Sequence, residues 1–419
     1  MKLNLSECCD FINGGSWTAN EYADNGHPIL KVSNFDKDSI SYNELSFLNI
    51  GSFEKYKKNQ LETHDIVIAT VGSHPSLVNS AAGRCITIPY AAKGLLLNQN
   101  AVCIRTKDSE IINQRYLGYL CKSQIFQHFI QQRGKGAANQ MRIPIGGIKD
   151  FEFDFPEISV QQKIASILSG YDDLIENNIK RIKLLEEKAR LTYEEWFVKM
   201  RFPGYETAVF DEVTGLPKGW ENLKLSDVAE INSSSIKKNY KGYIKYIDIA
   251  SVTPNKINFL TPYDIDDAPG RAKRVVKHGD IIWSCVRPNR KSHAVIWKPE
   301  LNLIASTGFC VITPKKIPTS YLYQYLTTES YVGYLTNLAG GAAYPAVKSA
   351  DFIDSDVTVP HPDLLIEFNK IIGLNFDVIC NLEKQNRILK EARDILLPRL
   401  MSGMVDVEAL QVGTLEMAD

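Results

Sequence analysis

Two stretches of this chain carry the same long heptad repeat, and this pattern constrains its fold more than any other feature. In each stretch, residues suited to a helix–helix seam recur at alternating steps of four and three, and the second set begins 207 positions after the first. The first set is Ile164, Leu168, Tyr171, Ile175, Asn178, Ile182, Leu185, Ala189, Thr192 and Trp196. The second set is Ile371, Asn375, Val378, Leu382, Gln385, Leu389, Ala392 and Leu396. A helix of about 36 residues is roughly 54 Å long, so each helix is predicted to need a partner helix.

We expect the two helices to pair with each other as an antiparallel coiled coil. Each seam has a polar residue near its middle, Asn178 in the first and Gln385 in the second. If these two residues lie opposite each other, Leu185 meets Val378. A buried amide pair fixes the register of a coiled coil at a cost in stability. The alternative is two unrelated amphipathic helices, each packed on its own globular segment.

The segments that precede the two helices also repeat, with a period of roughly 200 residues. The matching pieces are Leu5-Ser6-Glu7 with Leu225-Ser226-Asp227, Asp65-Ile66-Val67 with Asp280-Ile281-Ile282, and Gly134–Ala138 with Gly340–Ala343. Short β-rich runs are predicted at Ile66–Val71, Ala101–Ile104, Ile281–Val286, His293–Trp297 and Gly308–Thr313, and short helices at Gln114–Phe129 and Thr319–Leu338. The chain is therefore predicted to contain one unit twice, a mixed α/β globular segment followed by a long helix.

Charge is balanced overall and uneven locally. The net charge is −1, from 48 basic and 49 acidic residues, so the total says nothing about nucleic acid. The segment from Arg271 to Lys298 holds eight basic residues and one acid, Asp280, and the segment from Gln131 to Lys149 holds four basic residues and no acid. Two basic segments on a neutral background suit two phosphate-contacting surfaces. The alternative is a pair of solvated loops.

Several kinds of chemistry find no support in the sequence. There is no P-loop, no Gly-x-Gly-x-x-Gly after a strand, and no Asn-Pro-Pro-Tyr-like motif of an adenine methyltransferase. The eight cysteines show no metal-ligand spacing and are interpreted as reduced core thiols. An enzyme acting alone is therefore disfavoured, no metal site is predicted, and the apolar runs are too short to span a membrane. The polar N-terminus lacks a signal peptide, so a cytoplasmic location is expected.

A set of short segments, in order along nearly the whole chain, resembles the specificity subunit of a type I restriction–modification system. The segments are Gln161–Leu168, Glu195–Phe197, Gly215–Trp220, Leu225–Ala229, Ser306–Phe309, Gly340–Pro345, Arg387–Arg393 and Leu396–Gly403. The start of the second helix departs from the family pattern, because Asn369-Lys370-Ile371 stands where a Gln-Gln-Lys-Ile run is usual.

This resemblance implies a function that composition does not reveal. Subunits of this family read a bipartite, asymmetric double-stranded DNA site, one half with each globular domain, and the coiled coil sets the spacing. The resemblance also implies docking of two modification (methyltransferase) subunits and two restriction (translocase and nuclease) subunits. S-adenosylmethionine, ATP and Mg are used by those partners, and no cofactor is bound by this chain. The alternative is a non-catalytic coiled-coil adaptor of another DNA-modifying complex.

The predicted fold class is α+β (mixed α/β), with internal duplication and pseudo-twofold symmetry. Two target-recognition domains are joined by two long helices that form an antiparallel coiled coil. The predicted divisions are a first target-recognition domain at 1–156, a first long helix at 157–200, a connector at 201–219, a second target-recognition domain at 220–361, a second long helix at 362–402 and an acidic tail at 403–419.

Candidate DNA contacts follow from side-chain chemistry, because Arg suits guanine, Asn suits adenine, and basic residues also bind phosphate. In the second domain they are Arg287, Asn289, Arg290, Lys291, Tyr344 and Lys348. In the first domain they are Arg133, Lys135, Asn139, Gln140, Arg142, His74 and Arg84. No catalytic residue is predicted, and Asn178 and Gln385 are assigned to the register of the coiled coil.

Overall fold

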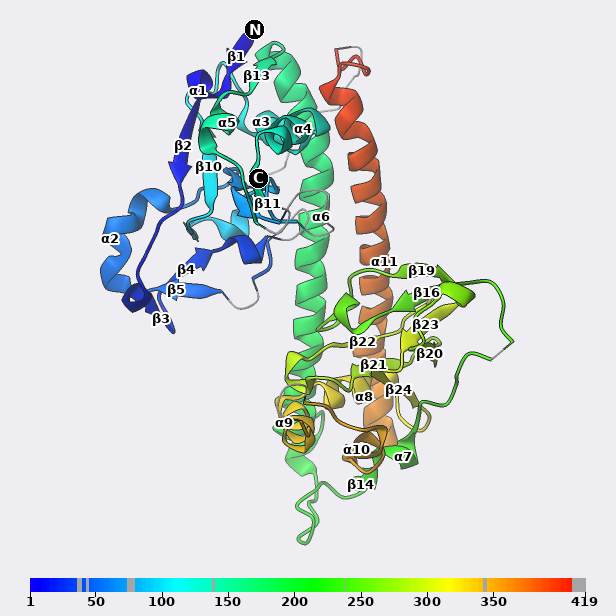
Figure 1. The fold of residues 1–419 in the computed structure, drawn as a ribbon. Coiled ribbons are helices and arrows are strands. Elements are labelled where there is room, and N and C mark those ends of the chain that lie inside the picture. The colour runs from blue at the N-terminus through cyan, green and yellow to red at the C-terminus, as the bar shows by residue number, and fades with distance from the viewer. Residues whose placement is uncertain are drawn as a thin grey trace. The chain divides into compact units, whose positions relative to one another are not determined.

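The computed structural model describes residues 1–35, 40–42, 45–73, 80–137, 140–237, 239–341 and 345–408. The chain divides into two compact units (Figure 1). The first unit comprises Met1–Ile175 and Arg387–Asp419, and the second comprises Glu176–Asn386. Each long helix contributes residues to both units, so the second heptad stretch returns the chain to the unit in which it began.

The elements of the two units follow one another in a similar order. Up to the first long helix they are β1 (Lys2–Asn4), α1 (Leu5–Cys8), β2 (Cys9–Asn13), β3 (Tyr22–Ala23), β4 (His27–Leu30), β5 (Ser46–Leu48), α2 (Phe53–Tyr56), β6 (Ile66–Ala69), β7 (Val71–Gly72), β8 (Cys85–Thr87), β9 (Leu96–Leu97), β10 (Ala101–Thr106), α3 (Gln114–Lys122), α4 (Gln124–Gln132), β11 (Lys135–Ala137), β12 (Gln140–Arg142), α5 (Ile145–Lys149), β13 (Glu152–Asp154) and α6 (Ile158–Tyr193). After it come β14 (Glu221–Lys224), α7 (Leu225–Val228), β15 (Ala229–Ile231), β16 (Tyr243–Ile247), β17 (Val252–Thr253), β18 (Lys256–Ile257), β19 (Thr261–Asp264), β20 (Ala272–Val275), β21 (Ile281–Ser284), β22 (His293–Val295), β23 (Leu303–Ser306), β24 (Phe309–Pro314), α8 (Thr319–Leu326), α9 (Glu329–Leu338), α10 (Ser349–Ile353), β25 (Asp356–Val359) and α11 (Pro362–Met401).

The sheets repeat as the sequence does. The antiparallel order β2-β10-β6-β8 in the first unit matches β15-β24-β21-β22 in the second, and the pair β1-β13 matches β14-β25. All residues of the two inner strands β6 and β21 are buried, which explains why these strands are apolar except for Ser284 at the end of β21. A second sheet in each unit contains one parallel pair, β4 with β9 and β16 with β23. The predicted α+β fold with internal duplication is confirmed.

A buried aspartate directly precedes each inner strand, and its carboxylate accepts hydrogen bonds from different side chains in the two units. The Asp65 carboxylate accepts a hydrogen bond from the Glu62 backbone N–H at 2.7 Å and both Nε and Nη2 of Arg105 at 2.6 Å. Asp280 accepts the Lys277 N–H at 2.8 Å, and the hydroxyl of Thr313 donates to it at 2.7 Å. Strand register places Arg105 and Thr313 at equivalent positions, each one residue beyond the partner of the strand's first isoleucine. Burial raises the pKa of Asp280.

Each predicted short helix is in fact two helices. The segment Gln114–Phe129 is divided at Ser123, and the segment Thr319–Leu338 is divided before Thr328. At each break a hydroxyl caps the next helix, because Thr328 accepts from the Tyr331 N–H at 3.3 Å and Ser123 from the Phe126 N–H at 3.5 Å. Ser and Thr favour this capping conformation over the helix interior, and the prediction from apolar spacing alone did not include that preference.

The two long helices pack antiparallel within each unit. In the first unit, Ile164 and Leu168 of α6 share a core with Leu400 of α11. In the second unit, Tyr193 near the end of α6 shares a core with Phe368 near the start of α11. Helix α6 continues into a π-helical turn at Glu194–Val198. The core of the first unit therefore contains the start of α6 and the end of α11, and the core of the second unit contains the end of α6 and the start of α11.

The seam of α11 differs from the predicted one at alternate positions. Asn375 and Leu382 are buried, as the heptad pattern predicts, but Val378 and Gln385 are exposed. The other inward positions lie one residue later and are buried or half-buried: Ile372, Ile379, Asn386 and Arg393. Leu185 is contacted by Asn375, whose Nδ2 donates to the Leu185 carbonyl at 3.1 Å. The prediction was wrong at these positions because the residue after each one also suits a seam, Ile379 after Val378 and Asn386 after Gln385, so the spacing alone did not distinguish them.

Polar residues on the inward positions are paired across the helices. Asn178 is 7% exposed, and its Nδ2 donates to Oδ1 of Asn386 at 3.0 Å and to Oε1 of Gln385 at 3.5 Å. Arg393 is also 7% exposed, and its Nη1 donates to Asp172 at 2.7 Å. Buried polar pairs of this kind specify register, because a one-turn slip would leave each partner unsatisfied.

Replacement of Asn178 tests this register contact. Asn178→Ala should lower the free energy of unfolding by about 1–3 kcal/mol, because it leaves the amides of α11 without their buried donor. Urea titration followed by circular dichroism measures the change. The exposed neighbour Asn177→Ala is the matched control and should stay within about 0.5 kcal/mol. Equal effects of the two substitutions would contradict a role for Asn178 in the seam.

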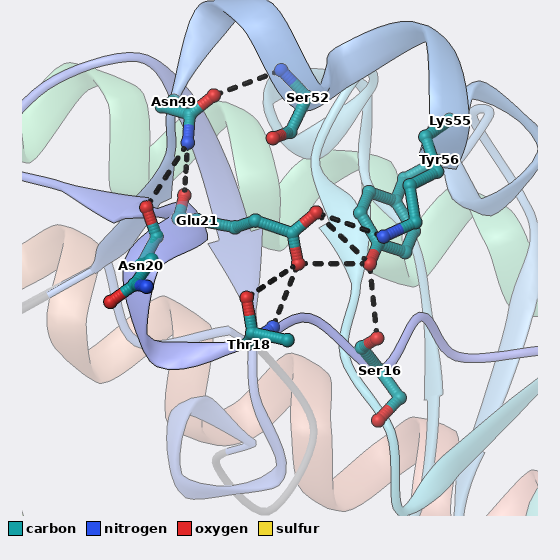
Figure 2. Close-up of polar contacts among 8 residues, drawn as sticks. All are labelled: Ser16, Thr18, Asn20, Glu21, Asn49, Ser52, Lys55 and Tyr56. Carbon is teal, nitrogen blue, oxygen red and sulfur yellow. Dashed lines mark hydrogen bonds and ion pairs between the residues drawn. The ribbon is translucent and has the colours of Figure 1, made fainter.

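A polar cluster around Glu21 ties the segment before β3 to helix α2 in the first unit (Figure 2). The Glu21 carboxylate accepts from the Thr18 N–H at 2.8 Å and from the Tyr56 hydroxyl at 3.1 Å, and Lys55 Nζ lies 3.0 Å away. The Thr18 N–H and the charge of Lys55 lower the pKa of Glu21 from 4.5 to about 2. The charged form therefore stabilises the fold.

This lowered pKa predicts how stability depends on pH. The contribution of the Glu21 carboxylate to the free energy of unfolding is present above pH 4.5. It is lost as the pH falls toward about 2, because the carboxylate of the folded chain then takes up a proton. Glu21→Gln should therefore melt at a lower temperature than the native chain at pH 7, and the difference should shrink between pH 4.5 and 2. Thermal melts at several pH values measure it, with the exposed Glu54→Gln as control. A difference that does not depend on pH would contradict the assignment.

Candidate nucleic-acid interface

In the second unit, two predicted contact segments lie side by side. The loop that follows β21, residues 285–291, pairs with residues 345–347 after α9. Val286 forms a bridge with Ala346, and the Arg287 N–H donates to the Pro345 carbonyl at 2.7 Å. Lys348 follows directly and is exposed at the start of α10. The structure thus brings the Arg287–Lys291 group and Lys348 to one end of the inner strand.

The 285–291 loop is a strained turn. Arg287 and Lys291 have φ values of 51° and 53°, a left-handed conformation that costs energy for residues other than glycine. Between them Pro288 is buried, whereas Asn289 and Arg290 are exposed. Lys291 is held by an ion pair with Glu329 at 2.5 Å, a partner that the sequence analysis missed. The turn therefore presents an amide and a guanidinium to solvent, the two groups suited to adenine and guanine.

The corresponding place in the first unit holds a small antiparallel sheet, β11-β12-β7. Strand β7 directly follows the inner strand β6, so this sheet stands at the same end of its unit's inner strand as the 285–291 loop. Lys135 and Arg142 are both exposed and lie directly opposite each other in the register. Like charges at opposed positions are unfavourable without a counter-ion. An anion such as phosphate would relieve that repulsion.

Other predicted residues take part in the fold. Arg84 donates to the carbonyls of Phe35 at 2.6 Å and Ser80 at 2.9 Å. The guanidinium of Arg133 lies 3.4 Å from the centre of the Phe129 ring. His74, Asn139 and Tyr344 lie outside the described residues, and for Gln140 the structure gives the backbone in β12.

The basic run from Arg271 to Lys298 is divided among several places. Arg271 and Lys273 are exposed at edge strand β20 of the second sheet, and Lys298 pairs with Asp377 at 2.6 Å. Among the described residues there is no group of His, Cys, Asp and Glu that could hold a metal ion. In the same part of the chain, no helix has the length and apolarity needed to cross a bilayer. All eight cysteines are free thiols.

Comparison with known proteins agrees with this architecture. A family model described as the type I restriction modification DNA specificity domain matches residues 1–187 and again 217–391. The type I restriction enzyme MjaIX specificity subunit of Methanocaldococcus jannaschii is 25% identical over 339 residues, covering 77% of this chain and 76% of that protein. The HindI specificity subunit of Haemophilus influenzae is 22% identical over 337 residues, covering 63% and 71%.

A solved structure shares the fold. The S subunit of a type I restriction–modification system from M. genitalium has a TM-score of 0.55 and 17% identity, and the alignment covers 96% of this chain and 95% of that one. The family model matches twice, and the two matches fall on the two halves of the internal duplication. The chain therefore belongs to the type I restriction–modification DNA specificity family.

Proposed function

We propose that this specificity subunit reads a split, asymmetric DNA site, with one half contacted by each unit. The observation that carries this proposal is the pair of equivalent positions beyond β6 and β21, where different polar groups follow the same strand topology. Because the two positions are equivalent in the fold, we infer that both contact DNA. Because their side chains differ, we infer that the two half-sites have different sequences. Arg287, Asn289, Arg290 and Lys348 are proposed for one half-site, and Lys135 and Arg142 for the other.

The long helices are proposed to dock two modification subunits. Large apolar side chains are exposed at intervals of seven residues on α6 and in the π-helical turn that follows it, namely Leu184, Leu191 and Val198, which are 69%, 45% and 58% exposed. Leu374 and Ile388 on α11 are 64% and 53% exposed. Exposed apolar groups in helical register favour a protein partner. In the proposed complex, which acts in the cytoplasm, the modification subunits use S-adenosylmethionine, and two restriction subunits use ATP and Mg.

Salt-dependent DNA binding tests the role of the first unit. If Lys135 and Arg142 each neutralise a phosphate, the double substitution Lys135→Ala and Arg142→Ala should reduce the slope of log K against log salt by about 2. The measurement is fluorescence anisotropy of the complex with the modification subunit. Lys58→Ala, another exposed lysine of the same unit, is the control and should leave the slope unchanged. An unchanged slope in the double variant would remove this surface from the interface.

A further inference from the structure

A cleft of about 770 Å³ opens in the second unit between the recognition domain and the two helices. Its walls come from α6, the β17–β18 hairpin, β22, α8 and α11. Much of the lining is apolar, including Trp297, Phe376 and Ile257, while Glu186 of α6 and Glu383 of α11 contribute carboxylates. This volume lies within the range of about 300–1,000 Å³ that is typical of sites for small molecules.

Charged side chains of both signs line the cleft, namely Lys183, Arg190, Lys291, Glu186, Glu187 and Glu383. Neither Glu186 nor Glu383 forms an ion pair with a residue in the part of the chain that the structure describes. Two cations at the rim are engaged elsewhere, since Arg190 pairs with Glu187 at 2.8 Å and Lys291 pairs with Glu329 at 2.5 Å.

The protonation of Glu186 depends on its burial and on the neighbouring carboxylate of Glu383. Burial and the charge of Glu383 raise the pKa of Glu186 to about 7. The Asn255 amide, Lys183 and Lys256 act more weakly in the opposite direction. A bound cation would therefore restore the charged form of the Glu186 carboxylate.

A buried histidine adds a third acceptor. His293 lines the cleft and is 3% exposed, and burial lowers its pKa to about 3, so the ring is neutral. The Tyr323 hydroxyl donates its single hydrogen bond to Oδ1 of Asn255 at 2.7 Å. His293 Nδ1 lies 2.9 Å from the oxygen of the same hydroxyl. Nδ1 must therefore be the donor, and Nε2 is an acceptor. Within the described residues, Nε2 has no hydrogen-bond partner.

We propose that this cleft binds an alkylammonium ion, such as the protonated head of an aliphatic diamine. Two carboxylates and an imidazole nitrogen form a set of acceptors that matches the three N–H donors of an ammonium group. Trp297 and Phe376 provide aromatic surface for the carbon chain and for cation–π contact. Asn289 and Arg290 are not among the residues that line the cleft, and the proposal goes beyond the proposed function.

Calorimetric titration of the full chain with 1,4-diaminobutane tests the proposal. Binding is expected at pH 8, about tenfold weaker at pH 6, and accompanied by proton release at pH 7, because Glu186 must ionise. Glu186→Gln and Glu383→Gln should each weaken binding at least tenfold at pH 8. Glu391→Gln, an exposed glutamate of α11 outside the cleft, should bind like the native chain.

Control ligands separate the proposed site from general charge effects. Tetramethylammonium has the charge but no N–H donors, and 1,4-butanediol has the length but no charge, so neither should bind. Absence of heat with the diamine at pH 8 would overturn the proposal. So would equal binding of tetramethylammonium, or native affinity in the Glu186→Gln chain with its circular dichroism spectrum intact.

Discussion

Substitution of Arg105 by methionine is expected to destabilise the first unit by about 3 kcal/mol. Its guanidinium makes two hydrogen bonds of 2.6 Å to Asp65, whose side chain is 3% exposed. Methionine keeps much of the side-chain volume and removes the charge, so the buried carboxylate loses both hydrogen bonds to the guanidinium and keeps the one from the Glu62 N–H. The loss follows from this uncompensated charge rather than from the removal of a favourable ion pair alone.

The second unit offers a matched control at the equivalent position. Thr313→Val removes one hydroxyl from Asp280, which keeps its bond to the Lys277 N–H. The expected loss is about 1–2 kcal/mol. Hydrogen exchange measured by mass spectrometry locates each effect, with faster exchange in β6 and β10 for Arg105→Met and in β21 and β24 for Thr313→Val. A native exchange pattern in Arg105→Met would contradict the structural role of the pair.

Substitution of Arg290 by alanine is expected to weaken DNA binding by about 1–3 kcal/mol, which is roughly tenfold or more. Arg290 is exposed on a turn bracketed by two strained residues, Arg287 and Lys291, and stored strain of this kind is found where a side chain must be presented in a fixed way. A contact to a base should relax the sequence requirement at one position. A contact to phosphate should weaken all sequences alike and lower the salt slope by about 1.

Lys298 provides the control for Arg290 because it belongs to the same basic run but pairs with Asp377. Lys298→Ala should leave DNA affinity and salt slope close to the native values. Competition binding of the complex with the modification subunit, using a library of DNA sites, measures both quantities. An unchanged affinity and an unchanged salt slope in Arg290→Ala would exclude that residue from the interface.

Periodicity made the long helices and the duplication predictable. A seam sustained over five turns or more has few alternative interpretations, and repeated pieces such as Asp65-Ile66-Val67 mark equivalent strands. The exact face of α11 was not predictable in this way, because Asn386 and Arg393 are inward only by virtue of Asn178 and Asp172 on the other helix. Polar residues on a seam become recognisable only when their partners are known.

The candidate site depended even more on tertiary contacts. Sequence chemistry selected Arg287 and Arg290, but the bridge from Val286 to Ala346 joins segments about 60 positions apart and follows no local pattern. Charge alone did not separate Arg290 from Lys298, because the ion pair of Lys298 is with Asp377, a residue far away in the sequence. The His293 acceptor likewise follows from its contact with Tyr323.

The most direct test of the central claim is the sequence of methylated adenines in DNA treated with the complex of this chain and its modification subunit. If each unit reads one half-site, methylation should occur at a split motif with two different halves and a fixed spacer, and only when this chain is present. Variants of Arg287 and Arg290 should then relax one half and leave the other unchanged. A continuous or palindromic motif, or methylation that does not require this chain, would contradict the account.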